Sequence, residues 1–145
     1  MTKPKVLFLC AGNSARSQMA EAFLRKYAGD HYDAFSAGLE PKGIHPYTVQ
    51  VMREIGIDLR GHTSKHLSQF LGKTSFAYVI TVCDQAEKNC PYFPGAGVRL
   101  HWSFEDPAAF NGTPEAMLAK FREVRDQINA QLRGWIAEQG IQPVT

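Results

Sequence analysis

Cys10-Ala11-Gly12-Asn13-Ser14-Ala15-Arg16-Ser17 is the stretch around which the chain is organised. It follows directly on the apolar run Val6-Leu7-Phe8-Leu9 and precedes an amphipathic segment, which predicts a loop between a buried strand and a helix. Its small residues let the backbone curl with the amide N–H groups pointing inward, as a cradle for a tetrahedral oxyanion needs. The residues expected to bind such an anion are Ala11, Gly12, Asn13, Ser14, Ala15 and Arg16.

The side chains of this loop predict a nucleophile in a positive field. Arg16 carries a planar guanidinium that can bind two oxygens of one anion, and the helix expected to start near Ser17 adds the positive end of its dipole. Cys10 lies at the bottom of this field, which favours its thiolate. Ser17 is expected to donate its hydroxyl to the sulfur, while Asn13 tolerates left-handed backbone and holds the loop in shape. The alternative is a buried cysteine that ends a strand, followed by a glycine turn and a surface arginine.

Length and composition predict one domain spanning residues 1–145. The 145 residues include 44% hydrophobic ones, an ordinary content for a globular core. The net charge is only +2 and the basic residues are scattered, so no nucleic-acid partner is expected. The N-terminal apolar run is shorter than a signal-peptide core or the ~20 residues of a membrane span. We expect a cytoplasmic protein without a membrane partner, and a monomer because every apolar stripe is assigned to one core.

Apolar runs alternate with helical periodicities along the chain. Strands are expected at residues 5–9, 34–37, 76–82 and 98–102. Helices are expected at 17–28, 46–55 with Val49, Met52 and Ile55 on the buried face, 67–71 capped by Ser64, and 113–139. This order predicts an α/β three-layer sandwich with a central four-stranded parallel sheet flanked by helices.

The loops at the carboxyl ends of these strands are expected to form one active edge, because ligands of open parallel sheets bind there. The strand at 76–82 delivers Cys83 to that edge, and the strand at 98–102 delivers Asp106-Pro107. A carboxylic acid that faces an anion cradle can protonate the leaving oxygen in cysteine-based group transfer. Asp106 is therefore the predicted general acid, with Glu105 as the alternative, although Asp-Pro is also a common turn pair.

Cys83 and Cys90 suggest a redox function in addition. The segment between them, Asp84-Gln85-Ala86-Glu87-Lys88-Asn89, favours a helix, which would separate the two cysteines by roughly 10 Å. A disulfide tolerates only about 4.4–6.8 Å between Cα atoms, so a bridge requires this segment to unwind. The three cysteines form no Cys-x-x-Cys pair and the five histidines lack metal-ligand spacing. Zinc held by the cysteines and His101 is thus the weaker alternative, and no metal is expected.

Over essentially its whole length the chain resembles the thioredoxin-coupled arsenate reductases, which share the fold of the low-molecular-weight tyrosine phosphatases. The matching motifs are the Cys10–Ser17 loop, the Cys83 to Cys90 spacing followed by Pro91, and Trp102-Ser103-Phe104-Glu105-Asp106-Pro107-Ala108. Phosphatases of this fold typically carry paired tyrosines after Asp-Pro, where this chain has Ala108-Ala109.

The resemblance implies a reaction and its partners. The Cys10 thiolate attacks arsenate, for which phosphate and sulfate are analogues, and Asp106 protonates the departing oxygen. Cys83 then attacks Cys10 and releases arsenite, and Cys90 attacks Cys83 to leave a disulfide that thioredoxin reduces. Some of these reductases hold potassium through residues matching Asn13, Glu21 and Ser36, with an acidic residue where this chain has Lys65.

The Lys65 difference argues against potassium, so no cofactor is expected. The ammonium of Lys65, or another side chain of its segment, is expected to supply the positive charge beside Glu21. The alternative is that Glu21 and Lys65 are solvated surface charges. Two other functions remain open from the residues alone: a low-molecular-weight tyrosine phosphatase acting through a Cys10 phosphocysteine, and a non-catalytic oxyanion-binding or redox-sensing domain.

Overall fold

The computed structural model describes residues 3–89 and 96–144, and its centre is a four-stranded, fully parallel sheet. The strands stand in the order β2-β1-β3-β4. They are β1 (Lys5–Cys10), β2 (Asp33–Gly38), β3 (Tyr78–Thr81) and β4 (Val98–His101). The predicted fold class is confirmed, and each predicted strand forms within two residues of its expected ends.

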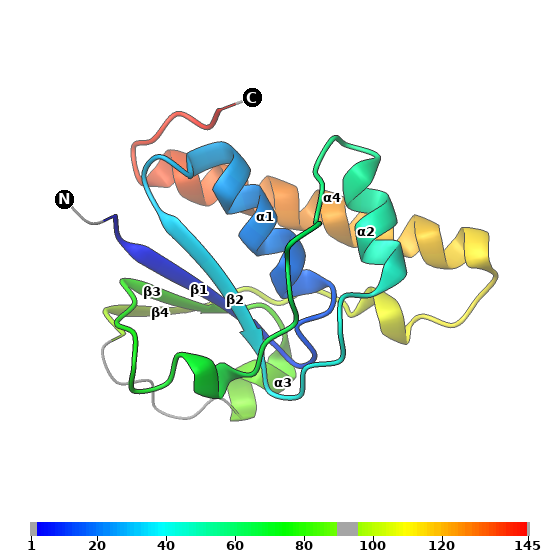
Figure 1. The fold of residues 1–145 in the computed structure, drawn as a ribbon. Helices are drawn as coiled ribbons and strands as arrows, with labels where there is room; N and C mark the ends of the chain where they lie inside the picture. Colours follow the sequence, from blue (N-terminus) through cyan, green and yellow to red (C-terminus); the bar gives the residue numbers. More distant parts are fainter. Residues whose placement is uncertain (1–2, 90–95, 145) are drawn as a thin grey trace.

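Helices cover both faces of this sheet (Figure 1). The described residues form four α-helices: α1 (Arg16–Ala28), α2 (Pro46–Arg53), α3 (Asp84–Asn89) and α4 (Pro114–Glu138). Two short 3₁₀ helices are η1 (Leu67–Gln69) and η2 (Pro107–Ala109). In Figure 1, α1, α2 and α4 gather on one side of the sheet, and α3 lies on the other.

The strand order places a topological switch point between β1 and β3. The chain leaves β1 toward β2 on one side and then crosses to β3 on the other side, with Leu9 paired to Thr81. At such a point the loops that follow the two strands diverge, and the space between them is the usual ligand site of an open parallel sheet. Cys10 ends β1 and Cys83 follows β3 by two residues, so both lie at this switch point.

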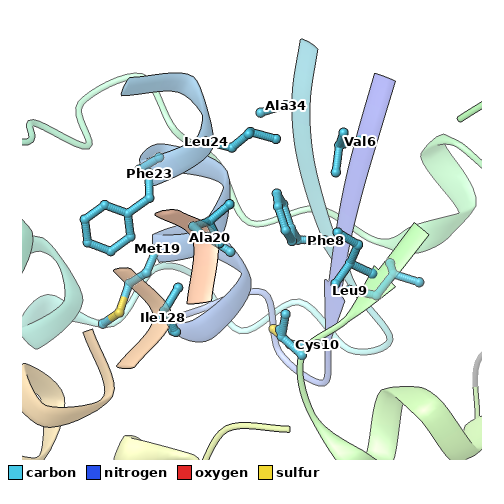
Figure 2. Close-up of a cluster of buried hydrophobic side chains, with 14 of the residues drawn as sticks. Val6, Phe8, Leu9, Cys10, Met19, Ala20, Phe23, Leu24, Ala34 and Ile128 are labelled. Atoms are coloured by element: carbon cyan, nitrogen blue, oxygen red, sulfur yellow. The ribbon is translucent and has the colours of Figure 1, made fainter. Parts of the chain in front are cut away.

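The core lies between β1 and helices α1 and α4. Figure 2 shows Phe8 of β1 and Phe23 of α1 within this cluster, with Ile128 of α4 beside Met19. All four of these side chains are fully buried. Burial on both faces explains why β1 is a continuous apolar run rather than an alternating one.

One local expectation is wrong and another is only partly correct. Ser64 does not cap the short helix: His66 does so, because its Nδ1 accepts from the N–H of Ser68, and the Ser64 hydroxyl donates instead to the carbonyl of Gly12. The expected face of α2 is only partly correct: Met52 is fully buried and the partly buried Val49 packs against the core, as does Ile55 just beyond the helix end at Arg53, but the fully buried Val51 was not expected. The packing of α2 against α4 determines which of its residues are buried most deeply. The hydrophobic periodicity of α2 alone does not predict this packing.

Truncating Phe23 is expected to destabilise the fold strongly. Its ring is fully buried and stacks on Tyr27 with 5.9 Å between ring centroids, so Phe23→Ala leaves a cavity and costs about 3–5 kcal/mol in the free energy of unfolding. Urea denaturation measures this loss. Val98→Ala is the matched control, because Val98 is 45% exposed and its change is expected to stay within about 0.5 kcal/mol. Equal losses in the two variants would contradict the core described here.

Candidate active site

The loop after β1 is held by its carbonyl groups, all of which point to donors outside the cradle. The backbone N–H groups of Leu39, Glu40, Lys42 and His45 donate to the carbonyls of Cys10, Ala11, Gly12 and Ser14 at 2.9–3.3 Å. The remaining two carbonyls, of Asn13 and Ala15, accept from Nε2 of Gln18 and the N–H of Met19. Because the carbonyls are engaged in this way, they are not directed at an anion in the loop, which is what the predicted cradle of inward N–H groups requires.

Gly38 is required for this arrangement. A Cβ atom at Gly38 would lie 2.8 Å from the backbone nitrogen of Asn13 and 2.9 Å from the carbonyl oxygen of Ala11. Both contacts are shorter than a real Cβ can make, so only glycine lets the end of β2 approach the loop this closely. Asn13 itself has φ +49°, the left-handed conformation expected for it.

The Cys10 sulfur is buried and receives hydrogen bonds from inside the loop. Its Sγ lies 2.8 Å from the Ser17 hydroxyl oxygen and 3.1 Å from the Asn13 backbone nitrogen, whose N–H donates to it. The Asn13 side chain donates to the same hydroxyl oxygen at 2.8 Å, which leaves the hydroxyl proton of Ser17 for the sulfur. Two hydrogen-bond donors therefore hold the sulfur in place at the base of the loop.

Arg16 and Asp106 face each other across the loop. Nη2 of Arg16 lies 3.6 Å from Oδ2 of Asp106, and its Nη1 donates to the carbonyl of Phe104 at 3.1 Å. The other carboxylate oxygen of Asp106 accepts from the N–H of Ala108 and so caps η2. The Arg16 side chain is 10% exposed, whereas the Asp106 side chain is 43% exposed. The Asp106 carboxylate is therefore the more accessible partner of the pair.

A small cavity of about 90 Å³ lies directly over the loop. Its lining consists of Cys10, Ala11, Gly12, Ser14, Ala15, Arg16, Lys42, Asp106 and Ala108. Every predicted residue of the cradle except Asn13 reaches this cavity, and the buried Asn13 acts from behind through its hydrogen bonds. Lys42 was not predicted, because nothing in its local sequence points to an anion site.

Cys83 lies beside this cavity, in a neighbouring hollow that shares Arg16 and Asp106 with it. Its buried sulfur accepts from the N–H of Ala86, in the first turn of α3. The structure thus brings Cys10 and Cys83 to the same edge of the sheet, as expected. Residues 84–89 form the predicted helix, while Cys90 lies outside the described residues.

Asp84 fixes the start of α3 to the end of β4. Its Oδ1 accepts from the Ser103 hydroxyl at 3.0 Å and lies 3.1 Å from Nε2 of His101. The hydrogen bond from Ser103, followed by that from His101, lowers the pKa of Asp84 below its usual value. The sequence did not indicate this cluster, because its members come from two strand ends that meet only in the folded sheet.

Glu21 is buried, so its interpretation as a solvated surface charge is wrong. The Ser36 hydroxyl donates to Oε1 at 2.7 Å, and Oε2 lies 3.1 Å from Nη2 of Arg25 and 3.3 Å from Nδ1 of His62. Lys65 instead donates to the carbonyl of Thr63. Burial lowers the pKa of His62 and that of Lys65, and the charge of Glu21 opposes both shifts.

The described residues contain no group of three or more His, Cys, Asp or Glu side chains placed to hold a metal ion. Within residues 3–89 and 96–144, no helix has the length and apolar character that crossing a bilayer requires.

Comparison with known proteins agrees with this geometry. The family model of the low molecular weight phosphotyrosine protein phosphatases matches residues 5–142. The arsenate reductase of Halalkalibacterium halodurans is 45% identical over 133 residues, which cover 92% of this chain and 95% of that protein.

Solved structures give the same picture. An arsenate reductase in a phosphate-binding state superposes with a TM-score of 0.76 at 33% identity, covering 93% of this chain and 98% of that one. The thioredoxin-dependent arsenate reductase of Corynebacterium glutamicum superposes with a TM-score of 0.70 at 30% identity, covering 94% of this chain and 62% of that one.

Proposed function

We propose that this chain, which belongs to the low molecular weight phosphotyrosine protein phosphatase family, reduces arsenate to arsenite. The observation that carries the proposal is the pair of buried thiols, Cys10 in an anion cradle and Cys83 at the end of the adjacent strand. Phosphate-ester hydrolysis needs the first thiol alone. The similarity to arsenate reductases over nine-tenths of the chain supports the same conclusion.

Arsenate binds in the cavity over the loop, with its oxygens on the inward N–H groups and on Arg16. The Cys10 thiolate attacks arsenic, a sulfur–arsenic bond forms and an arsenic–oxygen bond breaks. Asp106 lines the same cavity and gives the departing oxygen its proton, so that the oxygen leaves as water. Ser17 and the Asn13 N–H hold the sulfur in place for this attack.

Cys83 performs the reducing step. Its thiolate attacks the Cys10 sulfur, and a Cys10–Cys83 disulfide forms while the sulfur–arsenic electron pair stays on arsenic. Arsenic(V) thereby becomes arsenic(III) and leaves as arsenite. Arg16 and Asp106 line both the cavity over Cys10 and the hollow beside Cys83, so the two thiols lie in adjoining spaces.

Cys90 then attacks Cys83, and the Cys10 thiolate is released for another turnover. A Cys83–Cys90 disulfide requires α3 to unwind, because the six helical residues between them in the sequence rise about 9 Å, more than the about 4.4–6.8 Å between Cα atoms that a disulfide tolerates. Such a short helix is marginal on its own and unwinds at low cost. We propose thioredoxin as the reductant of the final disulfide, by analogy with the Corynebacterium glutamicum enzyme.

Asp106→Asn is expected to lower the hydrolysis of para-nitrophenyl phosphate by about 10²–10⁴-fold, because the leaving phenolate then departs without a proton. Initial rates across pH measure this, and the loss is expected to be smaller for esters with better leaving groups. Glu105→Gln is the matched control, because Glu105 pairs with Lys120 instead of lining the cavity. A larger loss in Glu105→Gln would transfer the acid role to that residue.

Potassium is expected to leave the activity unchanged. The carboxylate of Glu21 already contacts a hydroxyl, a guanidinium and an imidazole, and a positive Arg25 beside it disfavours a second cation. These residues therefore do not fit a potassium site. The positive charge beside Glu21 therefore comes from Arg25 of α1 and not from Lys65. His62 of the 60–66 segment contacts the same carboxylate oxygen. Initial rates in potassium and in sodium salts at equal ionic strength test this, and strong activation specific to potassium would contradict it.

The proposed function is tested by coupling the protein to thioredoxin, thioredoxin reductase and NADPH. Addition of arsenate is expected to start NADPH consumption that continues until arsenate or NADPH is exhausted. Phosphate at the same concentration, which offers no reducible centre, is the control. No turnover with arsenate, in a preparation that hydrolyses para-nitrophenyl phosphate, would leave the phosphatase as the function.

A further inference from the structure

One cationic side chain that lines the anion cavity, that of Lys42, has no role in the mechanism above. Lys42 lines the cavity together with Cys10, Gly12 and Arg16, although it comes from the loop between β2 and α2. Its side chain is exposed and forms no ion pair within the described residues. An exposed cation can therefore meet an incoming anion without first leaving a partner.

The position of Lys42 is fixed by the backbone around it. Its N–H donates to the carbonyl of Gly12 at 3.0 Å, and the flanking residues Glu40 and His45 are bonded to the same loop. The aliphatic stem then lies over Gly12, because a Cβ atom at Gly12 would be 3.4 Å from Cδ and 3.5 Å from Cγ of Lys42. The stem of Lys42 therefore forms part of the cavity wall, and its ammonium is within reach of an anion bound over the loop.

The charges in the cavity explain why a second cation is useful. Like phosphate, arsenate carries close to two negative charges near neutral pH, and it enters beside the Cys10 thiolate. Two sources of positive charge oppose these negative charges. One is Arg16, whose Nη2 also lies 3.6 Å from Oδ2 of Asp106, and the other is the α1 dipole, which contributes about half a charge. Without Lys42 the occupied cavity therefore holds more negative than positive charge.

We propose that Lys42 is a substrate-binding residue that recruits and holds the doubly charged oxyanion at the mouth of the cavity. This inference rests on the proposed function for the identity of the substrate. Arsenious acid, the product, is uncharged near neutral pH, so the same ammonium attracts the substrate and does not retain the product. Lys42 acts on binding and leaves the chemistry to Cys10, Arg16 and Asp106.

The test uses Lys42→Met, which removes the charge and keeps an unbranched stem over Gly12, and Lys42→Arg, which restores a charge. Lys26→Met is the matched control, because Lys26 is an exposed lysine ten residues along α1 from Arg16, about 15 Å away. Calorimetric titration with inorganic phosphate measures anion binding without any reduction. Urea unfolding of each variant verifies that the fold is intact.

Lys42→Met is expected to raise the Kd for phosphate roughly tenfold at low salt, with a smaller effect at high salt. Lys42→Arg is expected to recover most of the affinity, and Lys26→Met to bind like the unaltered protein. In the arsenate assay the loss is expected in KM, with kcat nearly unchanged. Phosphate binding by Lys42→Met equal to that of the unaltered protein, or a similar loss in Lys26→Met, would overturn the proposal.

The two proposals fail separately. If phosphate binding depends on Lys42 but the protein does not reduce arsenate, the role of Lys42 in anion binding stands and the reductase function falls. If arsenate is reduced and Lys42→Met changes neither KM nor the phosphate Kd, the reductase stands and the role of Lys42 falls.

Discussion

Cys10→Ser is expected to abolish both arsenate reduction and phosphate-ester hydrolysis, with turnover falling by about 10⁴-fold or more. The physical reason is that serine replaces the sulfur nucleophile, which two hydrogen-bond donors hold in place, with a hydroxyl that is a much weaker nucleophile. The coupled NADPH assay and the hydrolysis of para-nitrophenyl phosphate measure the two losses.

The control for Cys10→Ser is phosphate binding. The loop carbonyls are held by the 39–45 segment, by Gln18 and by the N–H of Met19, and none of these contacts requires the sulfur. We therefore expect the variant to bind phosphate in calorimetry while it turns over nothing. Residual reduction near the rate of the unaltered protein would show that the electrons enter through another thiol.

Cys83→Ser is expected to stop catalytic arsenate reduction and to spare ester hydrolysis. Cys83 is a buried thiol next to the anion cavity, so its replacement removes the thiolate that attacks the Cys10 sulfur of the adduct. Hydrolysis needs only Cys10, Arg16 and Asp106 and is expected to proceed at close to the normal rate. The same two assays, run side by side, measure the separation.

Added small thiols provide a second readout for Cys83→Ser. A free thiol at high concentration can attack the Cys10 sulfur in place of Cys83, so partial recovery of arsenite formation is expected. Cys90→Ser is expected to lose catalytic turnover in the same way. If Cys83→Ser keeps full thioredoxin-coupled turnover, the relay through Cys83 is wrong. This conclusion holds even if Cys10→Ser abolishes reduction.

The anion loop could be predicted from sequence because its signals are local. An apolar run before Cys10, small residues after it and Arg16 at the start of a helix lie within a dozen residues, and the structure assembles them in that order. The general position of Cys83 and Asp106 was also predictable. Parallel strands must deliver the residues that follow them to one edge of the sheet.

The features that sequence reasoning missed depend on contacts between distant segments. Lys42 reaches the cavity only because the 39–45 segment runs along the loop, and Gly38 permits that approach. Glu21 and Arg25 have the spacing of an ordinary surface pair on a helix, and only packing of the 60–66 segment against α1 buries the carboxylate. The hydrophobic periodicity of a single helix or strand does not predict packing between separate segments.

A single-turnover experiment tests the central claim most directly. Fully reduced protein is mixed with one equivalent of arsenate without any external reductant, and the products are analysed for arsenite and for disulfide-linked peptides by mass spectrometry. The relay predicts one arsenite per chain, a Cys83–Cys90 linkage and a free Cys10 thiol. Arsenite formed with Cys83 and Cys90 both still reduced, or no arsenite at all, would contradict the transfer of electrons through these three sulfurs.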